Sequence, residues 1–384
     1  MSEWKTVRLG DMLKTSSGGT PSKKNNDYYH NGNIPWILSG DISQGHITKA
    51  NNFITQLGLD NSSAKFFPKG TVLVAMYGAT VGQVGILDIE ATTNQAICGI
   101  FPDNHFSTNY LFYFCKSQKE HLLNLAIGGA QPNISQEIIK NLQIPLPPLE
   151  TQEQIATQLD KCTTIIAKYK QMLEKYDMLI KSRFIEMFGD PHNNTKYTYK
   201  NVGDFTTVTS GGTPDRKNIE YWKNGNIPWV KTTELQNNEL TNVEEFITQK
   251  GLDESSAKMM PIGTLLIAMY GQGKTRGMTA YLGIEASTNQ ACACILPSKV
   301  INQKFLWYYF ILSYDKLRDL AKGGNQPNLN GNMIKDFPVL MPPIEMQNEY
   351  VSFVQQIDKS KFAVQKSLEK AETLYKSLMQ EYFG

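Results

Sequence analysis

The segment Ser17-Gly18-Gly19-Thr20-Pro21 occurs a second time in this chain, 193 residues later, as Ser210-Gly211-Gly212-Thr213-Pro214. A repeat of this length is too long for a solenoid and indicates the duplication of a whole domain. The duplication therefore predicts two similar binding surfaces on one chain. Other motifs recur at the same offset or, beyond Gly78, at an offset of 195, because the second copy gains two residues there; they include Asn33-Ile34-Pro35-Trp36 with Asn226-Ile227-Pro228-Trp229, and Thr93-Asn94-Gln95-Ala96 with Thr288-Asn289-Gln290-Ala291.

The composition is that of a folded protein with room for two domains. The chain has 384 residues, of which 41% are hydrophobic and 19% charged. We expect a cytoplasmic protein, because no segment has the pattern of a signal peptide or approaches the ~20 apolar residues of a membrane span. The cysteines are odd in number and unequally shared between the copies, so we expect reduced thiols, mostly in the core. These are Cys98, Cys115, Cys162, Cys292 and Cys294.

The net charge is only +2, and both copies are balanced. Residues 1–189 hold 17 basic and 16 acidic side chains, which leaves 21 and 20 for the remainder. A protein that binds nucleic acid on its own usually has a basic excess, because phosphate contacts supply much of its affinity. If this chain binds DNA, its positive charge must be concentrated on one face, or partner subunits must supply part of it.

Each copy has the same plan, a mixed α/β unit followed by a long helix. Short apolar runs such as Thr71–Met76 predict strands between turns rich in Gly, Asn, Ser and Pro. Later in each unit, residues 109–125 and 303–320 predict a helix. The predicted fold class is α+β, with two tandem homologous domains joined by two long helices. The predicted segments are mixed α/β domains at 1–148 and 190–343, with long helices at 149–189 and 344–384.

Both long helices begin at a Pro-Pro pair, Pro147-Pro148 and Pro342-Pro343, and carry apolar residues at alternating spacings of four and three. This pattern predicts a coiled-coil seam, although a surface helix packed on its own domain is the alternative. If a pseudo-two-fold axis relates the repeats, the helices pack antiparallel as a rod of roughly 57 Å. The seam positions are Ile155, Leu159, Cys162, Ile166, Tyr169, Leu173, Tyr176 and Ile180 in the first helix, and Tyr350, Val354, Ile357, Lys361, Val364, Leu368, Ala371, Tyr375, Leu378 and Tyr382 in the second, with Lys361 as the misfit.

The run Pro147-Pro148-Leu149-Glu150-Thr151-Gln152-Glu153-Gln154-Ile155 leads into the first long helix, and Pro342-Pro343-Ile344-Glu345-Met346-Gln347 is its weaker echo. Together with the strand at 70–74, the Gly78–Gly82 loop and the Thr93-Asn94-Gln95 turn, these motifs resemble the specificity subunits of type I restriction-modification systems. The resemblance covers essentially the whole chain.

The resemblance implies a non-catalytic, DNA-binding subunit with two target recognition domains, each reading half of an interrupted site. The helices would set the spacer and dock two methyltransferase subunits, and restriction/translocase subunits would join them. S-adenosylmethionine, ATP and Mg²⁺ are then expected only on partner subunits, which methylate adenine at N6. Family members usually have unlike recognition domains. Because these two are similar, we expect related, inverted half-sites.

Residues that differ between the copies are candidates for reading bases, whereas shared ones are more suited to the scaffold or to phosphate. The loop at 78–83 differs most from its counterpart at 271–276, and the segment after each Asn-Ile-Pro-Trp motif also diverges. A solvent-exposed turn and an ordinary strand exit are the structural alternatives. The candidates in these segments are Thr80, Gln83, Gln272, Lys274, Thr275, Arg276, Ser39, Asp41, Thr232 and Glu234.

Shared polar residues form a second group of candidate DNA contacts. The amides of the two Thr-Asn-Gln turns suit adenine or a turn cap, and the glycine-rich loops near residues 131 and 326 suit phosphate. The charged residues after each Gly-Gly-Thr-Pro segment suit the DNA backbone or a solvated turn, whereas we expect Trp36 and Trp229 in the core. The members of the group are Asn94, Gln95, Asn289, Gln290, Gln131, Asn133, Gln326, Asn328, Thr20, Lys23, Lys24, Thr213, Arg216 and Lys217.

No catalytic motif is found in the sequence. The run from Gly271 to Thr275 resembles part of a phosphate-binding loop, but Ala268 stands where that motif requires glycine. The five histidines have no metal or triad spacing, and no adenine-methyltransferase signature is present. The remaining alternative is a duplicated, non-catalytic scaffold that binds protein or carbohydrate.

Overall fold

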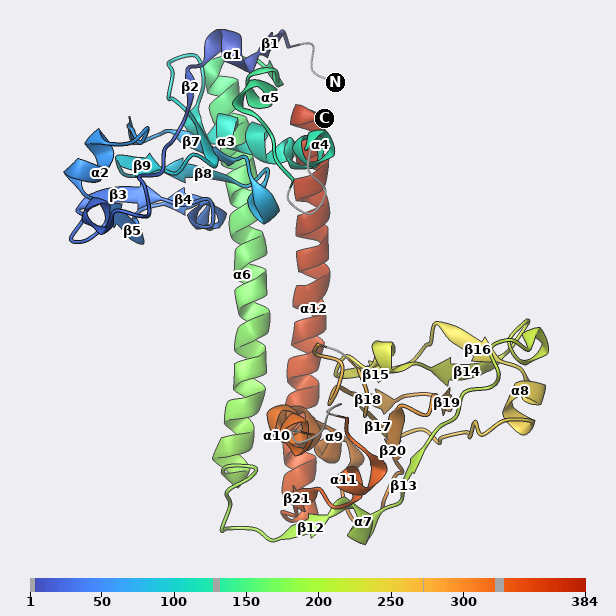
Figure 1. Ribbon diagram of the computed structural model, residues 1–384. Helices are drawn as coiled ribbons and strands as arrows, with labels where there is room; N and C mark the ends of the chain where they lie inside the picture. The colour runs from blue at the N-terminus through green and yellow to red at the C-terminus, as the bar shows by residue number, and fades with distance from the viewer. Residues whose placement is uncertain (1–3, 127–131, 272, 322–327) are drawn as a thin grey trace. The chain divides into compact units, whose positions relative to one another are not determined.

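The computed structural model describes residues 4–126, 132–271, 273–321 and 328–384, which fall into two compact units (Figure 1). The first unit comprises residues 1–171 and 365–384, and the second comprises residues 172–364. Each unit therefore contains one copy of the duplicated sequence, the start of the helix that follows it, and the end of the helix that belongs to the other copy.

The first unit is built on a five-stranded sheet in the order β2-β10-β7-β8-β4 and a four-stranded sheet in the order β5-β3-β9-β6. A separate pair, β1 and β11, joins the start of the copy to its end. Every residue of β7, β8 and β10 is buried, which fits their near-continuous apolar sequences. The strands are β1 (Thr6–Arg8), β2 (Thr15–Ser17), β3 (Ile34–Ile37), β4 (His46–Ile47), β5 (Asn52–Ile54), β6 (Phe66–Phe67), β7 (Val72–Ala75), β8 (Val84–Leu87), β9 (Ala91–Thr93), β10 (Ile97–Ile100) and β11 (Gln143–Pro145).

The second unit repeats this topology. Its five-stranded sheet has the order β13-β20-β17-β18-β15, and its smaller sheet, β16-β14-β19, has three strands. An isolated bridge between Met260 and Ala286 stands where the first unit has β6. The strands are β12 (Tyr199–Asn201), β13 (Val208–Ser210), β14 (Ile227–Val230), β15 (Asn238–Leu240), β16 (Glu245–Ile247), β17 (Leu265–Ala268), β18 (Thr279–Leu282), β19 (Ser287–Thr288), β20 (Cys292–Ile295) and β21 (Pro338–Leu340).

The helix expected late in each unit is in fact two helices. In the first unit α3 (Thr108–Ser117) packs on β7 and β8, and α4 (Lys119–Leu125) follows after Gln118 (Figure 1). In the second unit α9 (Gln303–Leu312) and α10 (Tyr314–Leu320) meet at Ser313, whose hydroxyl donates to the Tyr309 carbonyl at 2.7 Å. Such back-bonding bends a helix without changing its apolar spacing. The remaining short helices are α1 (Leu9–Met12), α2 (Gln56–Asp60), α5 (Gln136–Lys140), α7 (Val202–Phe205), α8 (Gln249–Asp253) and α11 (Gly331–Lys335).

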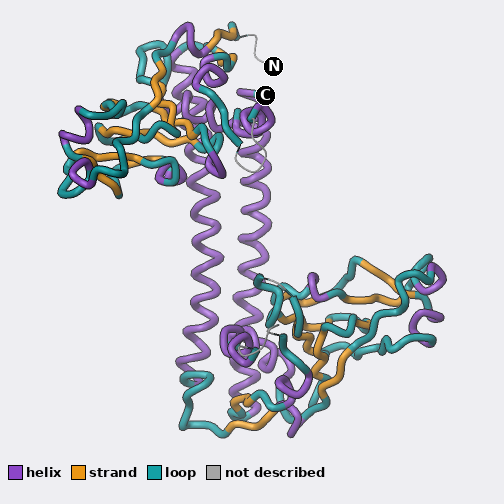
Figure 2. Tube along the Cα trace, in the orientation of Figure 1, coloured by secondary structure: helices purple, strands orange, loops and turns teal. Residues whose placement is uncertain are grey.

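The two long helices begin where the Pro-Pro pairs predict. They are α6 (Leu149–Phe188) and α12 (Ile344–Phe383), each of 40 residues and each without a break (Figure 2). A buried glutamine secures each start. Gln152 donates to the Pro147 carbonyl at 2.9 Å, and Gln347 donates to the Pro342 carbonyl at 2.8 Å. This role explains the glutamine that follows both Pro-Pro pairs.

The helices pack as antiparallel pairs within each unit. In the first unit Gln158 accepts a hydrogen bond from Tyr382, and Lys170 pairs with Glu372. Residues later in α6 thus contact residues earlier in α12, as in an antiparallel pair. In the second unit the misfit residue of the heptad pattern, Lys361, pairs with Asp177 at 2.5 Å. All the predicted seam residues are buried or half-buried, which confirms the seam. The lysine is tolerated there because its ammonium group reaches a carboxylate.

The end of each long helix completes the core of the unit built on the other copy. In the second unit Phe188 is fully buried, with its ring centre 5.4 Å from that of Phe305 and 5.7 Å from that of Tyr350. In the first unit Phe383 packs on Tyr110 at 5.2 Å. Phe188 and Phe383 are equivalent in the repeat, as are Tyr110 and Phe305. Both cores thus use the same contact between α3 or α9 and a helix end.

The five cysteines are buried free thiols, as expected for core residues. Burial raises the pKa of the Cys98 thiol to about 12, which makes it unreactive at neutral pH. Within the described ranges, no helix is both long enough and apolar enough to cross a bilayer.

Candidate nucleic-acid interface

The repeated Gly-Gly-Thr-Pro segments are held against the Thr-Asn-Gln turns. Gly19 N donates to the Thr93 carbonyl, and Gly212 N donates to the Thr288 carbonyl, both at 2.8 Å. A Cβ atom on Gly211 would lie 2.0 Å from the Thr288 carbonyl oxygen, so no larger residue fits. These glycines are needed because two backbone segments approach each other closely.

The tryptophans of the Asn-Ile-Pro-Trp motifs lie beneath this contact and belong to the core, as predicted. Trp36 is 5% exposed and Trp229 is 2% exposed. The indole of Trp36 donates to the Gly19 carbonyl at 3.1 Å, and that of Trp229 donates to the Gly212 carbonyl at 3.0 Å. Each tryptophan therefore holds the backbone of its Gly-Gly-Thr-Pro segment against the core.

Two of the predicted shared residues of each unit, a threonine and a glutamine, are in direct contact. The Thr20 hydroxyl donates to the Gln95 amide oxygen, and Thr213 does the same to Gln290. The chain at Met76 and Met269 runs beside these glutamines, since each methionine N donates at 2.8 Å to the carbonyl of the alanine that follows the glutamine. Both glutamines are exposed.

The residues that follow each glycine-rich loop, 132–134 and 328–329, lie beside the same threonine–glutamine contact. In the first unit Gly78 N donates to the Pro132 carbonyl at 2.8 Å, and Tyr77 forms a bridge with Asn133. In the second unit Leu329 N donates to the Met269 carbonyl at 3.0 Å, which repeats the bond from Ile134 to Met76. We name this place the recognition edge; it consists of Thr20, Tyr77, Gln95 and Asn133 in the first unit and of Thr213, Tyr270, Gln290 and Asn328 in the second.

Tyr77 and Tyr270 were not among the residues predicted from the sequence. They are equivalent in the repeat, stand directly before the divergent loop, and are each 42% exposed. An exposed aromatic ring at the same position in both copies suits contact with a sugar or a base. The signal available in the sequence was the identity of this residue in both copies, two residues beyond the end of a buried strand, but only the structure shows that the side chain is exposed.

Asn94 and Asn289 help to build the turn. Their backbone N–H groups donate at 3.0 Å to the carbonyls of Ile37 and Val230, at the ends of β3 and β14. The side-chain oxygen of Asn289 also accepts from Ala291 N at 3.1 Å. Both residues are half-buried, in contrast to the exposed glutamines beside them.

The carboxylates predicted after the Asn-Ile-Pro-Trp motifs organise their own turns. Asp41 accepts from Leu38 N and from the Asn51 amide, each at 2.9 Å. Glu234 is 9% exposed and accepts from Lys231 N at 2.8 Å and from Glu244 N at 2.9 Å. Both oxygens of each carboxylate are thus engaged. Ser39 and Thr232 lie at the same turns and are half-buried.

The predicted basic residues fall into two kinds. Lys23, Lys24 and Lys217 are exposed. Arg216 instead stacks over Trp222, with its guanidinium carbon 3.8 Å from the ring centre, and pairs with Glu245 at 2.5 Å. Arg216 therefore has contacts within the domain that compete with any phosphate.

The divergent loops lie next to the recognition edge, between β7 and β8 and between β17 and β18. The Thr80 hydroxyl donates to the Tyr77 carbonyl at 3.0 Å, and Gln83 is half-buried. Lys274 is exposed, whereas Thr275 and Arg276 are half-buried. The predicted residues Gln131, Gln272 and Gln326 lie outside the described residues.

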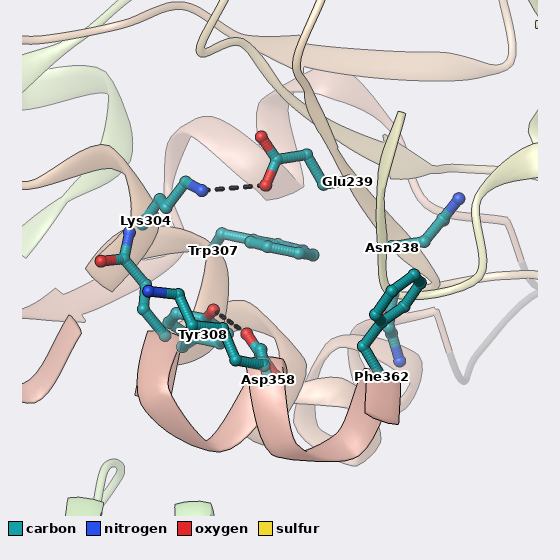
Figure 3. A pocket seen from close by; sticks show the side chains of 10 residues that line it. Asn238, Glu239, Lys304, Trp307, Tyr308, Asp358 and Phe362 are labelled. Atoms are coloured by element: carbon teal, nitrogen blue, oxygen red, sulfur yellow. Dashed lines mark hydrogen bonds and ion pairs between the residues drawn. The ribbon is translucent and has the colours of Figure 1, made fainter. Parts of the chain in front are cut away.

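A hollow of about 640 Å³ opens elsewhere in the second unit, lined by β15, α9 and α12. The Trp307 ring lies between the Glu239–Lys304 pair and the Tyr308–Asp358 pair, with Phe362 on another side (Figure 3). None of its lining residues is a predicted DNA contact. Its aromatic floor and its mixture of acidic and basic groups suit a protein surface better than a phosphate backbone.

Comparison with known proteins identifies the class of this two-unit fold. The chain belongs to the family described as the type I restriction modification DNA specificity domain, which matches residues 1–175 and 194–372. With two such domains, it is a specificity subunit of a type I restriction-modification system. The family match supports DNA recognition over the protein- or carbohydrate-binding scaffold.

Individual relatives match the whole chain or a single copy of the repeat. The type I restriction enzyme MjaIX specificity subunit of Methanocaldococcus jannaschii is 26% identical over 379 residues, which is 92% of this chain and 86% of that protein. The EcoR124I/EcoR124II specificity subunit of Escherichia coli is 29% identical over 168 residues, or 42% of this chain and 41% of that protein. The crystal structure of the S subunit of a type I system from M. genitalium shares the fold, with a TM-score of 0.62 and 17% identity over 100% of this chain and 96% of that one.

Proposed function

We propose that each unit of this specificity subunit meets one half of an interrupted DNA site with its recognition edge. The observation that carries the proposal is the convergence, in both copies, of an exposed tyrosine, an exposed glutamine and an exposed asparagine beside the divergent loop. These side chains can donate to and accept from bases and sugars, and the flanking lysines can meet phosphate.

The shared and divergent residues of this surface have different roles in the proposal. Tyr77, Gln95 and Asn133, with their counterparts, contact the DNA in the same way in both half-sites. The threonine bond occupies one lone pair of each glutamine oxygen, so that the glutamine NH₂ group serves mainly as a donor to the DNA. The loops at 78–83 and 271–276 read the bases. Because the shared residues are alike in the two units, we expect the two half-sites to be related and inverted. The half-sites differ in the bases that the two loops contact.

Three of the predicted residues have, in this proposal, a structural role rather than a contact with DNA. They are Asp41, Glu234 and Arg216. A carboxylate near DNA is repelled by phosphate. It is favourable there only where it accepts a hydrogen bond from a base such as cytosine. Both oxygens of Asp41 and of Glu234 already accept hydrogen bonds. Lys23, Lys24 and Lys217 remain the proposed phosphate contacts.

The proposed partners follow from the family. We propose that two methyltransferase subunits dock on this chain in the cytoplasm, that restriction/translocase subunits join them, and that this chain is not catalytic. S-adenosylmethionine, ATP and Mg²⁺ would then be held by those subunits. A helix of 40 residues is about 60 Å long, against ~34–36 Å for one turn of B-DNA. We propose that the helices set the number of base pairs between the half-sites.

The test is a double variant, Lys274→Ala with Arg276→Ala, in the complex with methyltransferase subunits. Binding is measured over a salt series on duplexes in which one half-site at a time is scrambled, after the methylated motif has been read by sequencing. We expect selectively weaker binding at the half-site of the second unit, with a salt slope lower by about 0.9 for each phosphate that the variant no longer neutralises. Lys250→Ala is the control, because Lys250 is exposed but pairs with Glu220. Equal weakening at both half-sites contradicts the assignment.

A further inference from the structure

The hydrogen bonds of the two divergent loops define which residues correspond. Gly82 and Gly277 both have positive φ, 75° and 85°, and their N–H groups donate to Ala75 and Ala268 at 3.0 and 2.9 Å. The offset of 195 beyond Gly78 pairs Gln83 with Met278. The bonds from Gln83 N to the Thr80 carbonyl and from Met278 N to the Thr275 carbonyl agree with this pairing.

The insertion in the second copy therefore lies before Thr275. Between Gly78 and Thr80 the first loop has one residue, Ala79, whereas the second has three residues between Gly271 and Thr275. Of these three, Gln272 lies outside the described residues and Lys274 is exposed. The longer loop contains Gly271 and Gly273, both with positive φ, so its own sequence does little to restrict its path.

Two side chains of α10 hold the backbone of this longer loop. The Tyr314 hydroxyl donates to the Lys274 carbonyl at 2.7 Å, and Arg318 Nη1 donates to the Arg276 carbonyl at 2.9 Å. Arg318 also donates to the Tyr314 hydroxyl at 3.1 Å, which links the two anchors. Both bonds end on backbone carbonyls, so they fix the path of the loop whatever side chains it carries.

In the first unit, other residue types stand at the positions of both anchors. At the offset of 195, Tyr314 corresponds to Lys119 and Arg318 to Leu123. Lys119 packs beside Gly82, and Leu123 packs against the apolar core of the first unit. The shorter loop instead closes on itself through a bond from Val81 N to the Gly78 carbonyl at 3.1 Å. The longer loop and its two anchors thus differ together between the copies.

We propose that Tyr314 and Arg318 are positioning residues that determine the specificity of the second recognition unit, because they hold the inserted loop against DNA. This inference rests on the proposed function of the loop. It assigns the difference between the two half-sites to the insertion and its anchors, and the common part of the half-sites to the recognition edge. The two residues act through the loop backbone and need not touch the DNA.

The experiment uses the complex with methyltransferase subunits and the variants Tyr314→Phe and Arg318→Met. The measurement is the ratio of kcat/KM for methylation of the cognate site to that of sites with single base changes in each half. Each variant removes one hydrogen bond to the loop backbone. We therefore expect each to lower the ratio about fivefold for changes in the second half-site and to leave the first half-site unchanged. The salt slope of Tyr314→Phe stays that of the native chain, because no charge is removed.

Further measurements separate this inference from the proposed function and from misfolding. Hydrogen exchange at residues 273–277 should be faster in Tyr314→Phe, while exchange in β17 and β20 stays unchanged. Lys119→Ala, the equivalent position in the first unit, should change neither half-site ratio. If Tyr314→Phe and Arg318→Met keep full discrimination while Lys274→Ala with Arg276→Ala loses it, the positioning role is refuted and the loop assignment stands. If the double variant also discriminates normally, both are refuted.

Discussion

Replacing Phe188 with alanine should destabilise the second unit, although Phe188 lies at the end of the helix that follows the first copy. Its side chain is fully buried, with ring centres of Phe184, Phe305 and Tyr350 at 5.0, 5.4 and 5.7 Å. A Phe→Ala change in a packed core costs about 3–5 kcal/mol of unfolding free energy. Aromatic pairs of this kind add roughly 0.5–1.5 kcal/mol each, so we expect a decrease near the top of that range.

The assay is urea unfolding followed by tryptophan fluorescence and by hydrogen exchange, which reports each unit separately. Exchange should become faster in β17 and β20 of the second unit, whereas β7 and β10 of the first unit should be unaffected. Phe188→Leu keeps most of the volume but loses the aromatic pairs, so it should lower the unfolding free energy by less than Phe188→Ala does. Ile185→Ala, at a position on the same turn that is 47% exposed, should cost less than about 1 kcal/mol. A decrease below about 1 kcal/mol for Phe188→Ala, or faster exchange in the first unit alone, would refute the reasoning.

Three further outcomes are expected. Gly211→Ala should destabilise the second unit by more than about 2 kcal/mol in urea unfolding, because the new Cβ would overlap the Thr288 carbonyl; stability close to native would contradict this. If the hollow beside Trp307 binds a methyltransferase subunit, Phe362→Glu should weaken that binding by about tenfold in calorimetry. The exposed control Ile219→Glu should bind with normal affinity. Equal affinities of the two variants would exclude the hollow as the binding site. Burial lowers the pKa of His192 to about 4 in the folded chain, so the unfolded chain binds an extra proton between roughly pH 6.5 and 4. The unfolding free energy of the second unit should therefore fall by about 1–2 kcal/mol as the pH falls through that range. His192→Phe should remove this pH dependence.

The sequence was sufficient for features whose signals are local or repeated. The Pro-Pro pairs predicted the starts of α6 and α12, and the alternation of spacings predicted the side of each helix that is buried. The duplicated motifs predicted two equivalent units, and the Trp36 and Trp229 positions predicted core residues. Each of these depends on neighbours in the chain or on a second copy for comparison.

Other features depend on contacts between distant residues and could not be predicted. The apolar spacing continues across Gln118 and Ser313, so nothing in the pattern showed that the expected helices are broken there. Arg216 could equally have contacted phosphate, and only the nearby Trp222 ring shows its place in the domain. The anchors of the longer loop lie about 40 residues beyond it, in a helix whose sequence gives no sign of that role.

The exchange of helix ends has a consequence for the order in which the chain is synthesised. The first unit contains residues 365–384, so its synthesis begins before that of the second unit but it lacks part of its core until residues 365–384 have emerged from the ribosome. At about 5–20 residues per second, translation of these 384 residues takes on the order of 20–80 seconds. The second unit, whose segments all lie between residues 172 and 364, has its complete sequence before the first does. A chain whose synthesis stops before residue 365 would therefore have an incomplete first unit, although most of that unit is translated before the second.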